Sequence, residues 1–284
     1  MRKDLKEIII LAANILKPSI IHIPTNCLAP AKILRMTEDI LEWLKQNKPD
    51  VKLTIKPSFD GIGEKHDEIR GVKGNYEKLL KTYSGLKKLK IAYPNLEVGL
   101  GTVISKMNYD HIDKIIEKIH ELEPDSYINE IAENRDEMFN VKSDIMPNHE
   151  EYASAVAKFE KYYSNLDKGK KSLKILLRTI YYREVIRYLE GKKERFDCYA
   201  GISNCHIDPY GNLWACCILG NSKPLGNLRE ENYDFRTVWH SEQAKDVLRS
   251  IKNKECNCPL ANQFYSNVLL NGRGVLAIIK QYLS

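Results

Sequence analysis

The chain has 284 residues, 43% of them hydrophobic and 29% charged, with a formal net charge of +6. This composition is ordinary for a folded protein of one large domain or two modest ones. The lysines are spread along helical segments that also carry Glu and Asp, which argues against a nucleic-acid-binding protein. The N-terminus has alternating charges, and no secretory signal is expected. The apolar run at residues 8–16 ends at Lys17-Pro18 and is too short to span a bilayer.

The first 131 residues alternate between helical and strand-like patterns. Apolar residues at helical spacing predict helices, and β-branched runs predict strands. The expected helices are 4–16, 30–46, 75–90 and 108–122, and the expected strands are 19–24, 51–55, 97–104 and 127–131. This alternation predicts an α/β fold with a parallel sheet and crossover helices. Four strand–helix units fit an open or incomplete barrel, or a small doubly wound sheet.

Two long helices, at 149–166 and 172–189, are expected next, without strands between them. The last third then changes character, because six of the seven cysteines lie between residues 198 and 258. An odd number of cysteines, grouped in this way, argues against a secreted disulfide framework. It favours a reducing cytoplasm in which a metal or iron–sulfur centre binds the thiolates.

Polar residues follow the first two predicted strands, where parallel sheets place their chemistry. Asn26 comes after the first strand, and Ser58 and Asp60 come after the second. Arg70, further along, has the geometry to bind a carboxylate through two hydrogen bonds. A turn with an Asp cap and a surface arginine accounts for the same residues, so the spacing leaves both interpretations open.

The cysteine-rich region is predicted to contain a hairpin. Residues 202–207 and 212–217 have strand character, and the turn between them contains Gly211. The hairpin would bring Cys205 and Cys216 to neighbouring places, with Cys198 just before its first strand. With a loop at Cys256 and Cys258, a set of four thiolates is available, namely Cys198, Cys216, Cys256 and Cys258. That set suits an iron–sulfur cluster or a tetrahedral zinc ion.

The other cysteines are expected to be small buried side chains. Cys205 and Cys217 are spare in the hairpin, since neighbouring residues of a strand point to opposite faces. Cys27 is alone in the first half of the chain. His206 is a further ligand candidate beside Cys205, although a lone strand histidine is more often a core or surface residue.

These residues carry a family resemblance. The cysteine region resembles the SPASM domain, or the shorter twitch domain, which binds an auxiliary cluster at the C-terminus of radical S-adenosylmethionine (radical SAM) enzymes. The residues that carry it are Cys198-Tyr-Ala-Gly, Asp208-Pro-Tyr-Gly211, Cys216, Pro224-Leu-Gly-Asn-Leu228, Trp239 and Cys256-Asn-Cys-Pro-Leu-Ala-Asn. In the first half, residues 58–71 are similar to the fourth-strand motif of the family's barrel, and Thr25-Asn26 resembles the end of its third strand.

The resemblance implies an incomplete (β/α)6 partial TIM barrel at residues 1–190 and a small α+β cysteine-rich domain at 191–284. The four strands would be the third to the sixth of the barrel. The family's Cys-x3-Cys-x2-Cys loop does not occur in the sequence. We therefore expect a chain that lacks the first two strand–helix units, is inactive alone, and self-associates through the exposed strand at 19–24.

The resemblance also implies a function. The parent class generates a 5′-deoxyadenosyl radical from S-adenosylmethionine and modifies a peptide or small-molecule substrate. One auxiliary [4Fe–4S] cluster would be bound by Cys198, Cys216, Cys256 and Cys258. S-adenosylmethionine would lie near Ser58, Asp60, Arg70 and Asn26, and no catalytic residue is assigned. The alternative is a non-enzymatic zinc-binding module that mediates a partner interaction.

Overall fold

The computed structural model describes residues 4–166 and 172–283, and the chain forms two compact units, Met1–Glu130 and Ile131–Ser284. The division lies earlier than the boundary expected at 190/191. The two long helices that follow the parallel sheet group with the cysteine-rich region, because the second of them packs against the last two helices of the chain.

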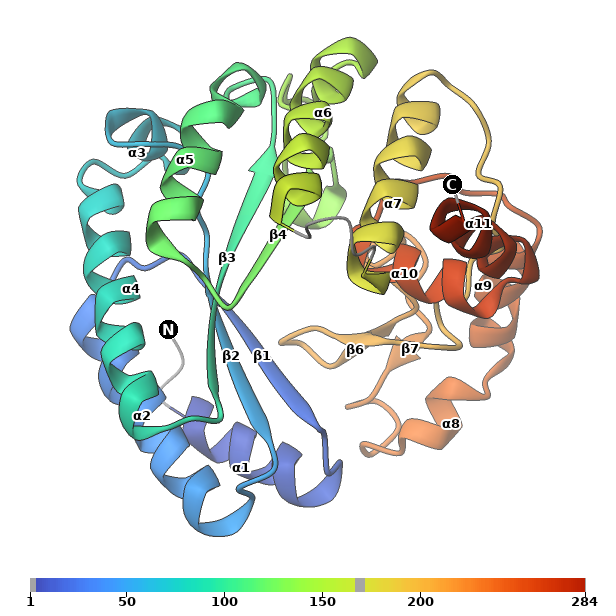
Figure 1. Ribbon diagram of the computed structural model, residues 1–284. Helices are drawn as coiled ribbons and strands as arrows, with labels where there is room; N and C mark the ends of the chain where they lie inside the picture. The colour runs from blue at the N-terminus through green and yellow to red at the C-terminus, as the bar shows by residue number, and fades with distance from the viewer. Residues whose placement is uncertain (1–3, 167–171, 284) are drawn as a thin grey trace. The chain divides into compact units, whose positions relative to one another are not determined.

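The first unit contains a four-stranded parallel sheet (Figure 1). The strand order follows the sequence, so each strand lies beside the next one in the chain. The strands are β1 (Ile20–Thr25), β2 (Lys52–Pro57), β3 (Leu96–Ile104) and β4 (Ser126–Ile131). The predicted α/β class with a parallel sheet is therefore confirmed. Among the described residues, β1 pairs with β2 alone and forms an edge of the sheet.

One helix precedes the first strand of this sheet, and the others connect its strands. They are α1 (Leu5–Ile15), α2 (Pro30–Asn47), α3 (Glu64–Arg70), α4 (Asn75–Ala92) and α5 (Ile112–Leu122). α1 packs on α2, α2 on α4, and α4 on β2 and β3. Pro30 occupies the first turn of α2, where its missing amide hydrogen has no helical partner to lose. The short helix α3 was not predicted, since seven residues are too few for a periodic pattern.

The core of the first unit follows from the alternation of side chains along the strands. In β3, the residues Leu96, Val98, Leu100 and Ile104 are fully buried, together with Leu79 and Leu86 of α4. The residues between them in β3 include Gly99 and Gly101, which lie on the opposite face of the sheet.

The second unit combines helices with a small antiparallel sheet. Its first two helices are α6 (His149–Leu166) and α7 (Leu173–Leu189), and its last two are α10 (Ala261–Leu270) and α11 (Gly272–Leu283). α7 packs against α6, α10 and α11. Between them lie β5 (His206–Ile207), β6 (Asn212–Trp214), β7 (Gly226–Asn227), α8 (Phe235–Trp239) and α9 (Glu242–Lys252). Within the two described stretches, no helix is long and apolar enough to cross a membrane.

The predicted hairpin exists but is shorter than expected. β5 and β6 pair in antiparallel fashion over His206–Ile207 and Leu213–Trp214 only. Residues 202–205 are not a strand, because the backbone closes a tight turn in which the amide of Gly201 donates to the carbonyl of Asn204. Beyond β6, residues 215–217 leave the sheet for a loop in which the amide of Lys223 donates to the carbonyl of Leu219.

Candidate metal centre

Four cysteines of the second unit line one cavity. They are Cys198, Cys216, Cys256 and Cys258. The rest of the wall is largely apolar and consists of Ala200, Ile218, Ile251, Leu260 and Phe264, with Glu194, Gln263 and Asn267 as its polar members. The open volume is small, about 20 Å³ for the centre of a water molecule. The structure thus brings together the four thiols that the sequence analysis grouped, from segments up to 60 residues apart.

Three of the thiols, those of Cys198, Cys256 and Cys258, lie on segments that contact packed helices. Cys198 precedes a turn whose Tyr199 amide donates to the side chain of Asn267 in α10 at 2.8 Å. Cys256 and Cys258 lie between α9 and α10. The hydroxyl of Tyr181 in α7 donates to the carbonyl of Pro259, the next residue, at 3.1 Å. The position of the Cys-x-Cys loop therefore depends on α7 as well as on the local sequence.

The electrostatic environment disfavours bare thiolates at this cavity. Burial raises the pKa of all four thiols above the ordinary value, and for Cys256 the pKa rises to about 11. The neighbouring thiols Cys198 and Cys216 raise the pKa of Cys256 further. A bound cationic centre would supply the positive charge that deprotonation of these groups requires.

Backbone amides partly offset this effect of burial. Amide groups of Ala200, Ile218, Leu219 and Leu260 lower the pKa of the thiols to which they are hydrogen-bonded. The amide of Ala200 donates to Cys198, the amides of Ile218 and Leu219 donate to Cys216, and the amide of Leu260 donates to Cys258. Amide hydrogen bonds to ligand sulfurs are one of the means by which proteins stabilise iron–sulfur clusters and set their potential. The four thiols fit an iron–sulfur cluster, and so do the backbone amides that donate hydrogen bonds to them.

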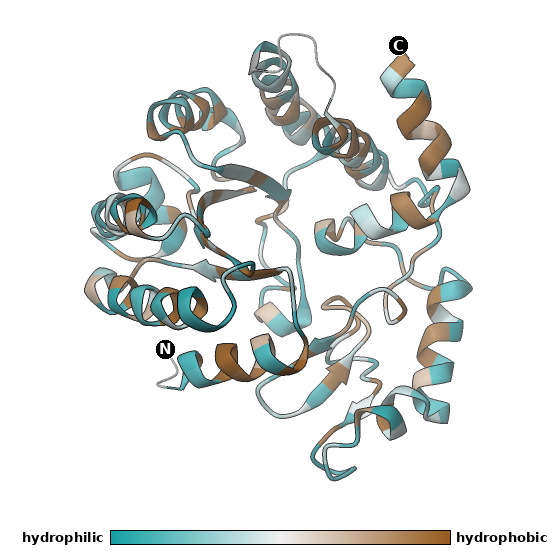
Figure 2. Cartoon of the chain, turned by 60° about the horizontal axis from the view of Figure 1, so that its bottom comes forward, coloured by the Kyte–Doolittle hydropathy of each residue, from teal (hydrophilic) through white to brown (hydrophobic). Residues whose placement is uncertain are grey.

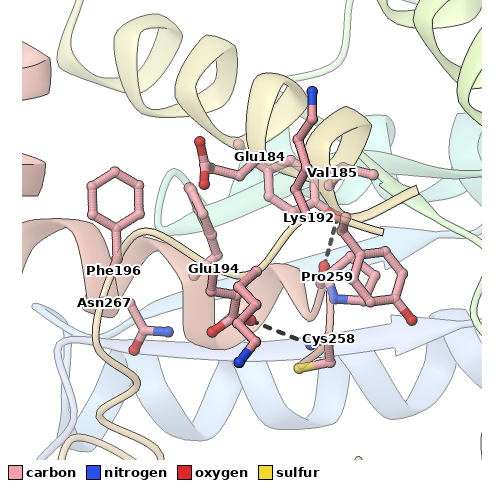
Figure 3. A pocket seen from close by; sticks show the side chains of 12 residues that line it. Glu184, Val185, Lys192, Glu194, Phe196, Cys258, Pro259 and Asn267 are labelled. Carbon is pink, nitrogen blue, oxygen red and sulfur yellow. Dashed lines mark hydrogen bonds between the residues drawn. The ribbon is translucent and has the colours of Figure 1, made fainter. Parts of the chain in front are cut away.

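A carboxylate borders the same cavity. The amide of Cys258 donates to Oε1 of Glu194 at 3.3 Å, and Figure 3 shows this contact beside the sulfur of Cys258. Burial raises the pKa of Glu194, while the amide of Cys258 and then Lys254 lower it. Glu194 was not predicted as a site residue, because a glutamate within Gly-Lys-Lys-Glu-Arg is typical of an exposed charged loop.

The remaining cysteines lie outside the wall of this cavity. Cys205 packs against the cluster of buried hydrophobic residues that the four cavity cysteines also contact. The sulfur of Cys217 lies 3.5 Å from Nδ1 of His206. Cys27 is wholly buried in the first unit, as a small core side chain would be. The positions of Cys205 and Cys27 agree with the interpretation as packing residues, whereas Cys217 and His206 form a polar pair that the sequence did not indicate.

No three His, Cys, Asp or Glu side chains within residues 4–166 and 172–283 converge closely enough to hold a single metal ion. Four thiolates that bind one zinc ion at about 2.3 Å stand within about 4 Å of one another. The thiolates of an iron–sulfur cluster bind separate iron atoms and stand further apart.

In the first unit, Asp60 and Arg70 are brought together. Nη1 of Arg70 donates to Oδ2 of Asp60 at 3.0 Å, and the amide of Val103 donates to Oδ1 at 2.7 Å. Asp60 is only 1% exposed, and its burial raises the pKa of the carboxyl, against the opposing effects of Val103 and Arg70. Both carboxylate oxygens therefore have partners inside the unit, and the pair fixes the loop after β2.

Asn26 and Ser58 come to the same edge of the sheet. Thr25 and Pro57 are register partners in β1 and β2, and Asn26 and Ser58 are the residues that follow them. Asn26 is exposed, and its carbonyl accepts a hydrogen bond from the side chain of Asn75 at 3.0 Å. The two loops thus lie side by side at the carboxyl end of the sheet.

A chain of hydrogen bonds connects these loops to the buried pair. Asn75 contacts Nε2 of His66 at 3.1 Å, and Nδ1 of His66 accepts from the amide of Asp60 at 3.2 Å. His66 is fully buried, and burial lowers its pKa. The neutral imidazole fits this arrangement, because one ring nitrogen must accept a hydrogen bond.

The sheet carries a further polar feature that the sequence analysis missed. A Cβ atom at Gly99 would meet Oγ of Ser126 at 2.7 Å, and one at Gly101 would meet the Lys56 side chain at 3.2 Å. The absence of side chains at these two positions of β3 lets Lys56 lie across the face of the sheet next to Ser58. The sequence signal for this feature was the pair Gly99 and Gly101, two positions apart in a predicted strand.

Comparison with known proteins supports this assignment of the cysteine region. Residues 198–259 match the SPASM family, described as an iron–sulfur cluster-binding domain. No curated protein sequence matches the chain.

The fold is similar to that of anSMEcpe, a radical SAM enzyme. Its structure with bound AdoMet shares 14% sequence identity and a TM-score of 0.54, over 92% of this chain and 69% of that one. The structure of anSMEcpe with AdoMet and the Cp18Cys peptide shares 15% identity and a TM-score of 0.52, over 91% and 73% of the two chains. Residues 198–259 thus match a family of iron–sulfur cluster-binding domains, and the fold of the chain is similar to that of anSMEcpe.

Proposed function

We propose that the second unit binds one [4Fe–4S] cluster through Cys198, Cys216, Cys256 and Cys258. The observation that carries the proposal is that these four side chains line one cavity. A bound cluster of this type transfers single electrons or anchors a substrate. The chain's own contribution is to hold four thiolates, to supply amide hydrogen bonds to them and to keep water away.

The apolar wall has a defined part in this function. Ile251 and Leu260 are nearly fully buried and belong to the hydrophobic cluster that surrounds the cysteines. Limited solvent access protects iron–sulfur clusters and influences their reduction potential. Glu194 places a carboxyl group at the border of the site and makes the local charge more negative when ionised.

We further propose that S-adenosylmethionine binds at the carboxyl edge of β1 and β2, next to Asn26 and Ser58. The AdoMet bound to anSMEcpe, a protein of similar fold, supports the choice of ligand. The location rests on the two adjacent loops at the carboxyl ends of parallel strands, where such sheets bind ligands. Asp60 and Arg70 then shape the loop from within, because their charged groups pair with each other. The substrate class of such a protein would be a peptide or a small molecule, modified in the cytoplasm.

No radical-generating step is assigned to these 284 residues alone, because outside the SPASM region the sequence contains one cysteine, Cys27. The proposal for this chain is cluster binding within a radical SAM-type enzyme. A zinc-stabilised binding module, the alternative from the sequence, becomes an outcome of the test below.

The test is anaerobic reconstitution of the purified chain with iron and sulfide, followed by metal, sulfide and absorbance measurements. We expect about four iron and four sulfide per chain and a broad band near about 400 nm. One zinc per chain without labile sulfide would support the alternative and contradict the proposal. A chain that retains neither metal would contradict both.

Single Cys→Ser variants test the ligand set. Replacing any of the four cavity cysteines should lower the iron content severalfold, because serine oxygen is a poor substitute for a soft thiolate. Cys205→Ser is the matched control, since Cys205 packs against the same cluster of residues without lining the cavity. Equal losses in Cys205→Ser and Cys216→Ser would overturn the assignment.

A further inference from the structure

An open groove on the second unit gathers positive charge. Its volume is about 610 Å³, and it is formed by α7, the loop at residues 193–196, Lys254 and α11. Six cationic side chains line it, namely Arg187, Lys193, Arg195, Lys254, Arg273 and Lys280. Glu194 is the single carboxylate in its wall. The volume falls within the range of sites that bind ligands larger than a simple anion.

Half of these cations are already paired. Arg187 and Arg195 both form ion pairs with Glu184, and Lys254 pairs with Asp197 at 3.1 Å.

The other three cations, Lys193, Arg273 and Lys280, have no ion-pair partner among the described residues. They come from two separate segments, the 193–196 loop and α11, so the tertiary structure collects them around one groove. Like charges that are gathered without partners repel one another, and an anionic ligand would relieve this repulsion.

The groove also has an apolar side. Leu276 is 58% exposed and lines the groove together with Ala277. Figure 2 shows hydrophobic residues recurring along α11 towards the C-terminus, and Ile279 of this helix is also exposed. A ligand that fits both features carries negative charges beside apolar side chains.

We propose that this groove binds an acidic segment of a polypeptide, with carboxylates against Lys193, Arg273 and Lys280 and an apolar side chain against Leu276. A single-stranded nucleic acid fits less well, because base stacking needs an exposed aromatic ring. The aromatic residue of the groove, Phe196, is 5% exposed, and its ring packs edge-on against Phe264. A bilayer surface also fits less well, since the cations line a concavity.

The groove leads towards the metal centre. Lys193, Glu194 and Phe196 also line a narrow pocket that reaches Cys258, and Figure 3 shows Glu194 and Phe196 in its wall. A polypeptide in the groove would therefore lie next to the cysteine cavity. The inference goes beyond the proposed function and does not depend on it, because the three unpaired cations lie outside the wall of the cysteine cavity.

The experiment measures fluorescence anisotropy of a labelled peptide of alternating Glu and Leu, about twelve residues long, titrated with the full chain. A peptide with Lys in place of Glu is the charge control. We expect saturable binding of the Glu peptide that weakens as salt increases, and at least about tenfold weaker binding of the Lys peptide. An RNA oligonucleotide of similar length is titrated in parallel.

A charge-reversal variant locates the site. Lys193→Glu, Arg273→Glu and Lys280→Glu combined should weaken Glu-peptide binding at least about tenfold. The matched control combines Lys142→Glu, Lys223→Glu and Arg236→Glu, which changes the net charge equally at exposed positions outside the groove. The control should stay within about twofold of the wild type, because distant surface charges act through a screened field.

Folding is checked by thermal unfolding, and the charge-conserving variant Lys193→Arg, Arg273→Lys, Lys280→Arg should retain binding. Equal weakening by the groove and control variants, or tighter binding of the RNA than of the Glu peptide, would overturn the proposal. The titrations are done before and after iron reconstitution. Peptide binding without iron uptake would support the groove while contradicting the cluster, so the two failures are distinguishable.

Discussion

Arg70 donates a hydrogen bond to the carboxylate of Asp60 at 3.0 Å. The Arg70 side chain is 27% exposed, and that of Asp60 is 2% exposed. Removing the cation would leave a buried carboxylate without its charged partner. We expect Arg70→Ala to lower the free energy of unfolding by about 3 kcal/mol. Urea denaturation followed by circular dichroism measures this change.

Lys65→Ala is the control for this variant, because Lys65 pairs with Glu68 on the exposed surface of the same helix. Its effect should stay below about 0.5 kcal/mol. The double variant Asp60→Asn, Arg70→Ala should recover part of the loss, since a neutral amide needs no cation. Equal effects of Arg70→Ala and Lys65→Ala would mean that Asp60 does not need its partner.

The buried His66 predicts a pH dependence of stability. Burial lowers the pKa of His66 in the folded state below the value of 6.5 in the unfolded chain. The unfolded chain therefore binds more protons as the pH falls, so the stabilisation is complete above about pH 6.5 and decreases below it. The urea concentration at the unfolding midpoint of the wild type should decrease as the pH is lowered from about 7.5 to about 5.5. His66→Gln should show a flatter profile, and an unchanged profile would contradict the assignment to His66.

The thiol of Cys27 should resist alkylation in the folded protein. Burial raises the pKa of Cys27 to about 12, and the side chain has no exposed surface. At pH 8 the thiolate fraction is on the order of one in ten thousand, and the thiolate is the reactive form. Mass spectrometry after iodoacetamide treatment of iron-free protein should find Cys27 unmodified. Labelling of Cys27 as fast as Cys205 under native conditions would contradict its burial, and complete labelling in guanidinium is the control.

Gly211 is required by the hairpin turn that precedes Cys216. Its φ of +91° is unfavourable for other residues, and a Cβ atom would meet Cγ of Arg229 at 2.9 Å. Gly211→Ala should destabilise the chain by about 1–2 kcal/mol and reduce cluster loading. Gly272→Ala is the matched control, because Gly272 lies in α11 with open space around it and alanine favours a helix. If Gly211→Ala binds as much iron as the wild type, the conformation of this turn is not needed for cluster binding.

The outer edge of β1 should mediate self-association. The carbonyls of Ser19 and Thr25 accept from β2, so the alternate residues Ile20, His22 and Pro24 direct their backbone groups to the other side. Pro24 already blocks one of these positions, and Ile20 is 56% exposed. We expect concentration-dependent association in light scattering. His22→Pro should reduce it without loss of a hydrogen bond to β2, and a monomer at every concentration would contradict the expectation.

The sequence by itself determined most helices and strands and the four cysteines of the proposed ligand set. Hydrophobic periodicity is a local property, so α2, α4 and β3 were predicted to within about two residues. The clustering of cysteines, the predicted hairpin and the Cys-x-Cys pair grouped Cys198, Cys216, Cys256 and Cys258 before any fold was known.

Only the tertiary structure decided what these residues face. It directed Asp60 inward to Arg70 and Val103, brought Glu194 to the amide of Cys258, and collected Lys193 and α11 around one groove. These relationships join residues that are 10 to 87 positions apart in the chain. Contacts of this kind depend on how helices and loops pack, and packing is set by the whole unit rather than by any local pattern.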